Sequence, residues 1–127
     1  MRAVIESFDR RFNYLKPKIR RTIIKAAKFL KARDGYVEIS LVNDKIMKKN
    51  VLAFPVPKNF PRPETGNKAL GEVYLNPSYI QKKGESVSYM AIHGFLHLLG
   101  YDHKKKNDRM KMEQKERILF QKLRIVY

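Results

Sequence analysis

Residues 86–99 read SVSYMAIHGFLHLL and form the segment that decides the fold. Serine is favoured just before a helix, because its side chain accepts a hydrogen bond from a free backbone N–H of the first turn, and Ser86 is in that place. Glycine is common just after the last turn, and Gly100 is in that place. The residues between them are apolar almost all round, which is typical of a helix buried on every side. The segment therefore predicts a central buried helix.

Strands and helices are predicted to alternate around this helix. Alternating or β-branched patterns indicate strands, and apolar residues spaced three and four apart indicate helices. The predicted strands are 2–8, 36–42, 51–54 and 69–75, and the predicted helices besides 86–99 are 14–32, a short helix from Asn76-Pro77, and 107–123. We expect 51–54 to be a buried strand. The proline-rich stretch 55–68 is expected to be a loop.

Length and composition favour one globular domain over residues 1–127. The chain is 43% apolar, which is enough for one real core, and it contains no cysteine, so disulfides are excluded. Any zinc must then be held by nitrogen and oxygen ligands. The first nine residues do not resemble a signal peptide, and no apolar run is long enough to span a membrane. The expected location is the cytoplasm.

The net charge indicates a polyanionic partner. The chain has 28 Lys and Arg against 12 Asp and Glu, a formal charge of +16. Such a charge attracts nucleic acid or an anionic membrane over a long range, although a solvated basic surface is the simplest explanation. The basic residues are spread along the chain and do not line one amphipathic anchor, which favours nucleic acid.

All three histidines of the chain lie within residues 93–103. His93 and His97 are four apart, so a helix places both on one face, as two ligands of one ion require. Gly100 ends the helix and allows the chain to bring His103 to the same ion. Three nitrogen ligands leave a fourth position open, which is typical of a catalytic zinc, although nickel, iron or copper also accept three histidines.

The same spacing argues against a peptidase. Metzincin proteases share the ligand spacing, but they carry a glutamate directly after the first histidine as general base. Here that residue is Gly94. A lone histidine on an apolar helix is more often a satisfied core residue, but three histidines beside a well-placed helix break are harder to attribute to chance. The sequence therefore predicts a metal site without the usual peptidase base.

The motif HGFLHLLGYDH at 93–103 resembles the signature HGxLHLxGYDH of the YbeY family, the bacterial endoribonucleases and rRNA maturation factors. Flanking stretches are also similar to the family: VLAFP at 51–55, LGEV at 70–73, and ME and ERIL at 112–113 and 116–119. The order of elements agrees too, so the resemblance covers nearly the whole chain.

This resemblance implies an α/β (α+β) fold, a small mixed sheet of about four strands packed with about five helices, with the metal site on the central buried helix. It implies one zinc ion held by His93, His97 and His103, through which these residues act in hydrolysis of single-stranded RNA. The implied role is 16S rRNA 3′-end maturation and ribosome quality control, with rRNA and the ribosome as partners. The oligomeric state stays open.

Residues 44–50 depart from the family, whose members usually carry a Tyr-Arg pair in this segment. Here the segment has no arginine, and its cations are the candidate RNA contacts Lys45, Lys48 and Lys49. A lysine is a point charge and cannot bind a phosphate bidentately as arginine does. The alternative function is therefore a non-catalytic RNA- or ribosome-binding assembly factor with a structural metal.

Overall fold

The structure is a computed structural model of the chain, and it describes residues 1–32, 34–56, 69–101 and 104–123. The strands are β1 (Arg2–Ser7), β2 (Tyr36–Leu41), β3 (Val51–Pro55) and β4 (Ala69–Leu75). The helices are a 3-10 helix η1 (Arg10–Leu15) and the α-helices α1 (Lys16–Phe29), α2 (Pro77–Lys82), α3 (Val87–Leu98) and α4 (Lys106–Leu123). None of the helices in these ranges is long and apolar enough to cross a membrane.

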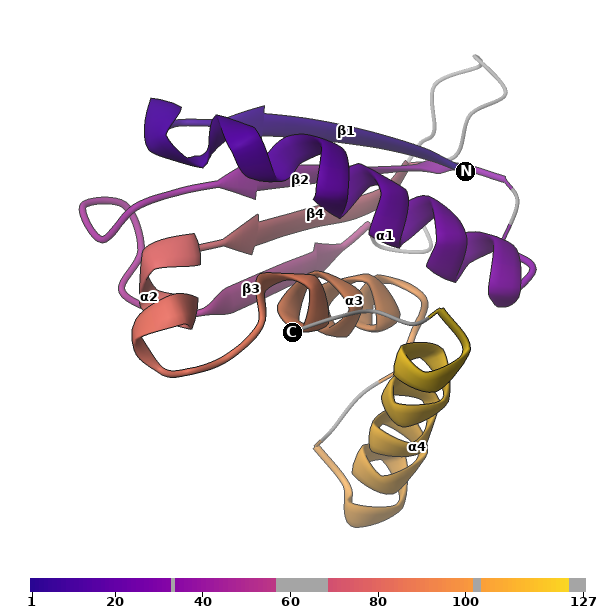
Figure 1. Cartoon of the computed structure of the whole chain (residues 1–127). Helices are drawn as coiled ribbons and strands as arrows, with labels where there is room; N and C mark the ends of the chain where they lie inside the picture. The colour runs from indigo at the N-terminus through magenta and orange to yellow at the C-terminus, as the bar shows by residue number, and fades with distance from the viewer. Residues whose placement is uncertain (33, 57–68, 102–103, 124–127) are drawn as a thin grey trace.

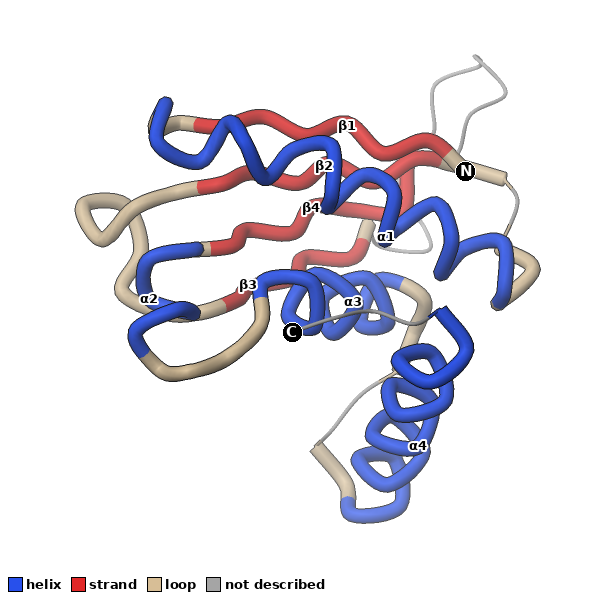
Figure 2. The backbone as a smooth tube through the Cα atoms, viewed as in Figure 1, coloured by secondary structure: helices blue, strands red, loops and turns tan. Residues whose placement is uncertain are grey.

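The four strands form one mixed sheet, as the resemblance implies. Their order is β1-β2-β4-β3; β1, β2 and β4 run parallel, and β3 is antiparallel to β4. The described residues hold four α-helices and one short 3-10 helix, against an expectation of about five helices. Helices α1 and α3 lie side by side on one face of the sheet, and α4 packs beyond α3 (Figures 1 and 2).

The core lies between the sheet and α1 and α3. Apolar residues at alternate strand positions point to this side, and apolar residues at spacings of three and four on α1 meet them. Within α3, Ile92, Phe95 and Leu96 have no exposed surface. The prediction of a central buried helix at 86–99 is therefore confirmed, with Ser86 as its N-cap, since the Ser86 side chain accepts a hydrogen bond from the Tyr89 amide.

The prediction that 51–54 is a buried strand is wrong. Strand β3 lies at the edge of the sheet and pairs on one side only, with β4. Val51 and Ala53 are partly buried against the core, whereas Phe54 is 52% exposed. Its apolar run resembles a buried strand because both faces carry apolar residues. The predicted helix 14–32 also begins differently, as η1 followed by α1, and most of the predicted loop 55–68 lies outside the described residues.

The other face of the sheet carries acidic side chains. Glu38 of β2 and Glu72 of β4 are adjacent in register, and both are exposed, as is Glu6 of β1. No helix of the described ranges covers this face (Figure 1). Like charges on neighbouring strands repel, and this placement is tolerated because water screens them. The uncovered face of the sheet thus carries three carboxylates beside the exposed ring of Phe54, while the core residues lie on the covered face.

Candidate metal centre

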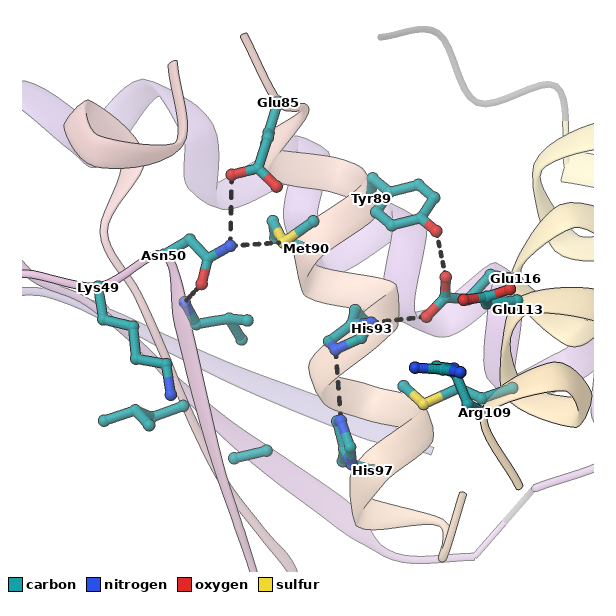
Figure 3. Close-up of a pocket in the computed structure, with 14 residues that line it drawn as sticks. Lys49, Asn50, Glu85, Tyr89, Met90, His93, His97, Arg109, Glu113 and Glu116 are labelled. Carbon is teal, nitrogen blue, oxygen red and sulfur yellow. Dashed lines mark hydrogen bonds and ion pairs between the residues drawn. The ribbon is translucent and has the colours of Figure 1, made fainter. Parts of the chain in front are cut away.

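Helix α3 brings the two predicted histidine ligands together. His93 and His97 lie one turn apart, and their Nε2 atoms are 3.3 Å from each other. Figure 3 shows both rings on the same side of α3, facing a pocket. Two nitrogen ligands of a tetrahedral zinc, at 2.0–2.1 Å from the ion, lie about 3.3–3.4 Å apart. The separation of the two nitrogens therefore fits ligands that share one ion.

The orientation of the His93 ring is set by Glu116 of α4. The Nδ1 atom of His93 lies 2.6 Å from Glu116 Oε1, and the hydroxyl of Tyr89 donates a hydrogen bond to Oε2 of the same carboxylate. Because a carboxylate only accepts hydrogen bonds, His93 carries its proton on Nδ1. In the neutral ring, Nε2 is then the nitrogen with the free lone pair, and it is the nitrogen that lies toward His97, as a shared metal requires.

Glu116 was not found by sequence reasoning, although the sequence contains a signal for it. Residues Met112, Glu116 and Leu119 follow helical spacing, and all three are at most 2% exposed. A glutamate in the apolar stripe of a helix is unexpected, because an unpartnered buried carboxylate is strongly destabilising. Such a residue indicates a partner elsewhere, and here the partners are Tyr89 and His93.

Gly94 allows α3 to lie close against the sheet. A Cβ atom at this position would be 2.6 Å from Val73 Cγ1 and 3.3 Å from Val51 Cγ2. Residue 94 therefore faces β4 and β3, while His93 and His97 face the pocket. A glutamate at 94 would point into the sheet, which gives a structural reason for the absence of the metzincin base at this position.

The two histidines line a pocket of about 520 Å³. Its walls come from the start of β3, from α3 and from α4, and its charged side chains are Lys49, Glu85, Arg109, Glu113 and Glu116 (Figure 3). Two cations and three carboxylates give a formal charge of one negative unit with neutral histidines. A bound divalent cation would make the net charge of the pocket positive. The empty pocket therefore favours a cation, and the metal-loaded pocket would favour an anion.

Of the candidate RNA contacts, Lys49 lines this pocket, while Lys45 and Lys48 are exposed and are not among its lining residues. The connection 43–50 is held by Asn76, which is fully buried. The Asn76 side chain donates to Asp44 Oδ1 and to the Met47 carbonyl, both at 2.7 Å, and its oxygen accepts from the Tyr79 amide at the start of α2. One asparagine therefore fixes the segment that presents Lys49.

The third predicted ligand, His103, lies outside the described residues. Within the ranges that the structure describes, no three His, Asp or Glu side chains converge closely enough to hold an ion. The pocket residues Tyr89, Arg109 and Glu113 were also not foreseen, because their sequence positions give no sign that α4 closes over α3.

The fold and this pocket define a small α/β protein with a histidine pair on its central helix. A family model described as Endoribonuclease YbeY matches residues 11–124, and the chain belongs to the YbeY family. A relative named Endoribonuclease YbeY from Rhodopseudomonas palustris is 31% identical over 84 residues, covering 60% of this chain and 44% of its own length. One from Chelativorans is 37% identical over 84 residues, covering 60% and 51%.

The match to another relative of the same name, from Pelagibacter ubique, is longer. It is 28% identical over 130 residues, covering 93% of this chain and 78% of the relative. The chain thus spans about half the length of the Rhodopseudomonas and Chelativorans relatives and more of this one. A solution structure of a Thermotoga maritima protein aligns with a TM-score of 0.48 at 21% identity, covering 97% of this chain and 91% of that one.

Proposed function

We propose that this protein is a metal-dependent endoribonuclease that hydrolyses single-stranded RNA. The observation that carries the proposal is the pair of Nε2 atoms 3.3 Å apart in a pocket with cationic side chains. Family membership supports the reaction class, since the matching relatives are named endoribonucleases. We further propose the 3′ end of 16S rRNA on the ribosome as the substrate, following the resemblance of the 93–103 motif.

The donor set suits one zinc ion, held by His93 and His97, with His103 as the proposed third ligand. When bound, such an ion polarises a phosphate oxygen and lowers the pKa of a bound water. Glu116 accepts a hydrogen bond from His93 Nδ1 and so orients the ring with Nε2 toward the pocket. Glu113 lines the same pocket and is exposed, so its carboxylate is available to take a proton from water.

The chain's cations are suited to hold the RNA strand. Lys49 enters the pocket from the segment before β3, opposite the wall formed by α4 (Figure 3). Its ammonium group is a point charge that pairs with a phosphate without selecting a base. Substrate binding is then expected to depend on phosphates and strand shape more than on base sequence.

Bound metal and RNA cleavage are measured together in one comparison. Wild-type protein and His97→Ala are purified in parallel, assayed for bound metal, and incubated with labelled single-stranded RNA and with casein. We expect wild type to hold about one zinc per chain and to cleave the RNA, and His97→Ala to lose both properties. A chelator should stop cleavage by wild type.

Three results would contradict the proposal. Equal cleavage by both proteins identifies a contaminating nuclease. Wild type that binds zinc and RNA but never cuts is the assembly factor considered from the sequence. Casein cleavage that disappears in His97→Ala identifies a peptidase.

A further inference from the structure

Arg109 places a guanidinium at the metal pocket. The residue lies in the first turns of α4, and it lines the same cavity as His93 and His97. In Figure 3 its side chain extends from α4 toward the side of α3 that carries the two histidines. Nothing in the sequence distinguishes Arg109 from the many other lysines and arginines of the chain.

The guanidinium is available to a ligand. Within the described residues, no carboxylate lies within ion-pair distance of Arg109, and no side-chain hydrogen bond engages it. The buried carboxylate of Glu116, which lines the same pocket, is already bound by Tyr89 and His93. Arg109 is exposed, so a ligand can reach it without displacing other residues.

The opposite wall supplies a cation of a different kind. Lys49 lines the pocket from the 44–50 segment, which contains lysines and no arginine. A planar guanidinium binds two phosphate oxygens at once, whereas an ammonium group binds as a point charge. Among the described residues that line the pocket, the one arginine therefore comes from α4 and not from the segment before β3.

We propose that Arg109 binds a phosphate of the RNA strand at the metal pocket and holds it bidentately. This inference rests on the proposed function and names the residue that orients the substrate. Lys49 binds a neighbouring phosphate from the other wall, so a strand with successive phosphates engages both cations. A mononucleotide engages only one of them and binds more weakly.

The test compares Arg109→Ala and Arg109→Lys with the matched control Arg117→Ala. Arg117 is an exposed arginine of the same helix, about 12 Å further along its axis and outside the pocket lining, so its loss removes the same charge. Two quantities are measured: kcat/KM on single-stranded RNA, and the Kd of a fluorescent single-stranded RNA in chelator without metal. Bound metal is assayed in every variant.

Arg109→Ala is expected to lower kcat/KM about 10- to 100-fold and to raise Kd by about 10-fold or more, at unchanged metal content. Arg109→Lys is expected to fall between wild type and Arg109→Ala, because it keeps the charge but loses the two-pronged contact. Arg117→Ala should stay within about two-fold of wild type, as expected for a screened surface charge.

The outcomes separate this inference from the proposed function. If wild type cleaves RNA and Arg109→Ala matches Arg117→Ala in both measurements, Arg109 does not bind substrate, and the proposed function stands. If wild type does not cleave but Arg109→Ala still weakens RNA binding more than Arg117→Ala, the phosphate contact stands without the nuclease. Full recovery by Arg109→Lys would contradict the bidentate contact.

Discussion

Glu116 connects two helices through one buried carboxylate. One oxygen accepts from His93 Nδ1 at 2.6 Å and the other from the Tyr89 hydroxyl, so both oxygens are bound although the residue is only 2% exposed. Partners of this kind orient metal-binding histidines and raise their basicity. The metal affinity of the site is therefore expected to depend on a residue that does not contact the ion.

Replacing Glu116 with Gln tests this dependence. A glutamine offers one acceptor oxygen to two donors, so either His93 or Tyr89 loses its partner. We expect zinc affinity to fall about 10- to 100-fold. The measurement is competition with a chromogenic chelator. Glu6→Gln, the same chemical change on the far face of the sheet, is the control. Equal zinc affinity in the two variants would show that Glu116 has no such role.

Gly94 gives a prediction about stability. Gly94→Ala would place a Cβ 2.6 Å from Val73 Cγ1, so α3 or β4 must shift. We expect the free energy of unfolding to fall by about 1–3 kcal/mol, despite the better helix propensity of alanine. Chemical denaturation measures it.

The matching control for Gly94→Ala is a double-mutant cycle with Val73→Ala, which removes the clashing methyl groups. The cost of Gly94→Ala should be smaller in the Val73→Ala background. Identical costs in both backgrounds would mean that the helix–sheet contact is not tight at this point.

At single residues, the sequence predicted what is close together along the chain. His93 and His97 follow from helical geometry alone, because four residues make about one turn. Glu116 lies 23 residues from His93, and its role depends on how α4 packs on α3. Arg109 and Lys49 are likewise far apart in the sequence and line the same pocket only because of the fold. Contacts between distant segments follow from tertiary packing, which local periodicity does not encode.

Among the elements, the connection 43–50 depends on Asn76. Its side chain makes three hydrogen bonds: two donated to Asp44 and Met47, and one accepted from Tyr79. Asn76→Ala removes all three, and we expect it to lower the free energy of unfolding by about 2–4 kcal/mol. Thermal or denaturant unfolding measures the change.

The control is Ser86→Ala, which removes only the N-cap hydrogen bond of α3. It should lower the free energy of unfolding by about 1 kcal/mol. Asn76→Asp keeps an oxygen for the Tyr79 amide but loses the donors and faces Asp44, so it should still be destabilising. If Asn76→Ala costs no more than Ser86→Ala, the hydrogen bonds to the connection do not contribute to stability.

Most elements agree with the sequence because their signals are local. Residues 69–75 and the helix capped by Ser86 appear where alternation and capping predicted them. Strand β3 was predicted to be buried but lies at the edge of the sheet. Apolar residues on both faces of a strand do not distinguish an edge strand from an internal one. On α4, Met110 is 57% exposed whereas Met112 is buried, a difference that follows from how the helix packs on α3.

For the whole molecule, the distribution of charge separates two surfaces. The helix side holds the pocket, where Lys49 and Arg109 lie among three carboxylates, and the uncovered sheet face carries Glu6, Glu38 and Glu72. A polyanion is attracted by the net charge of +16 and repelled locally by these glutamates. RNA is therefore expected to approach from the helix side.

Binding of single-stranded RNA should weaken steeply with salt. Each phosphate neutralised by a cation releases counterions, with a slope of about −0.7 in log K against log salt concentration. Two contacts, through Lys49 and Arg109, give a slope of about −1.4, and each further phosphate contact makes the slope more negative. Fluorescence anisotropy over a salt series, in chelator, measures the slope. A slope near zero would show that phosphate contacts do not drive binding.

The close contact at Gly94 also limits which reactions this architecture can acquire in evolution. A base placed directly after the first histidine would have to displace Val73 and Val51, so that route to a peptidase would cost stability. Helix α4 imposes no such barrier, because Arg109 and Glu113 face the pocket from an exposed surface. The histidine helix is therefore the constrained wall of the site, whereas the exposed positions Arg109 and Glu113 of α4 can be replaced at little cost to folding.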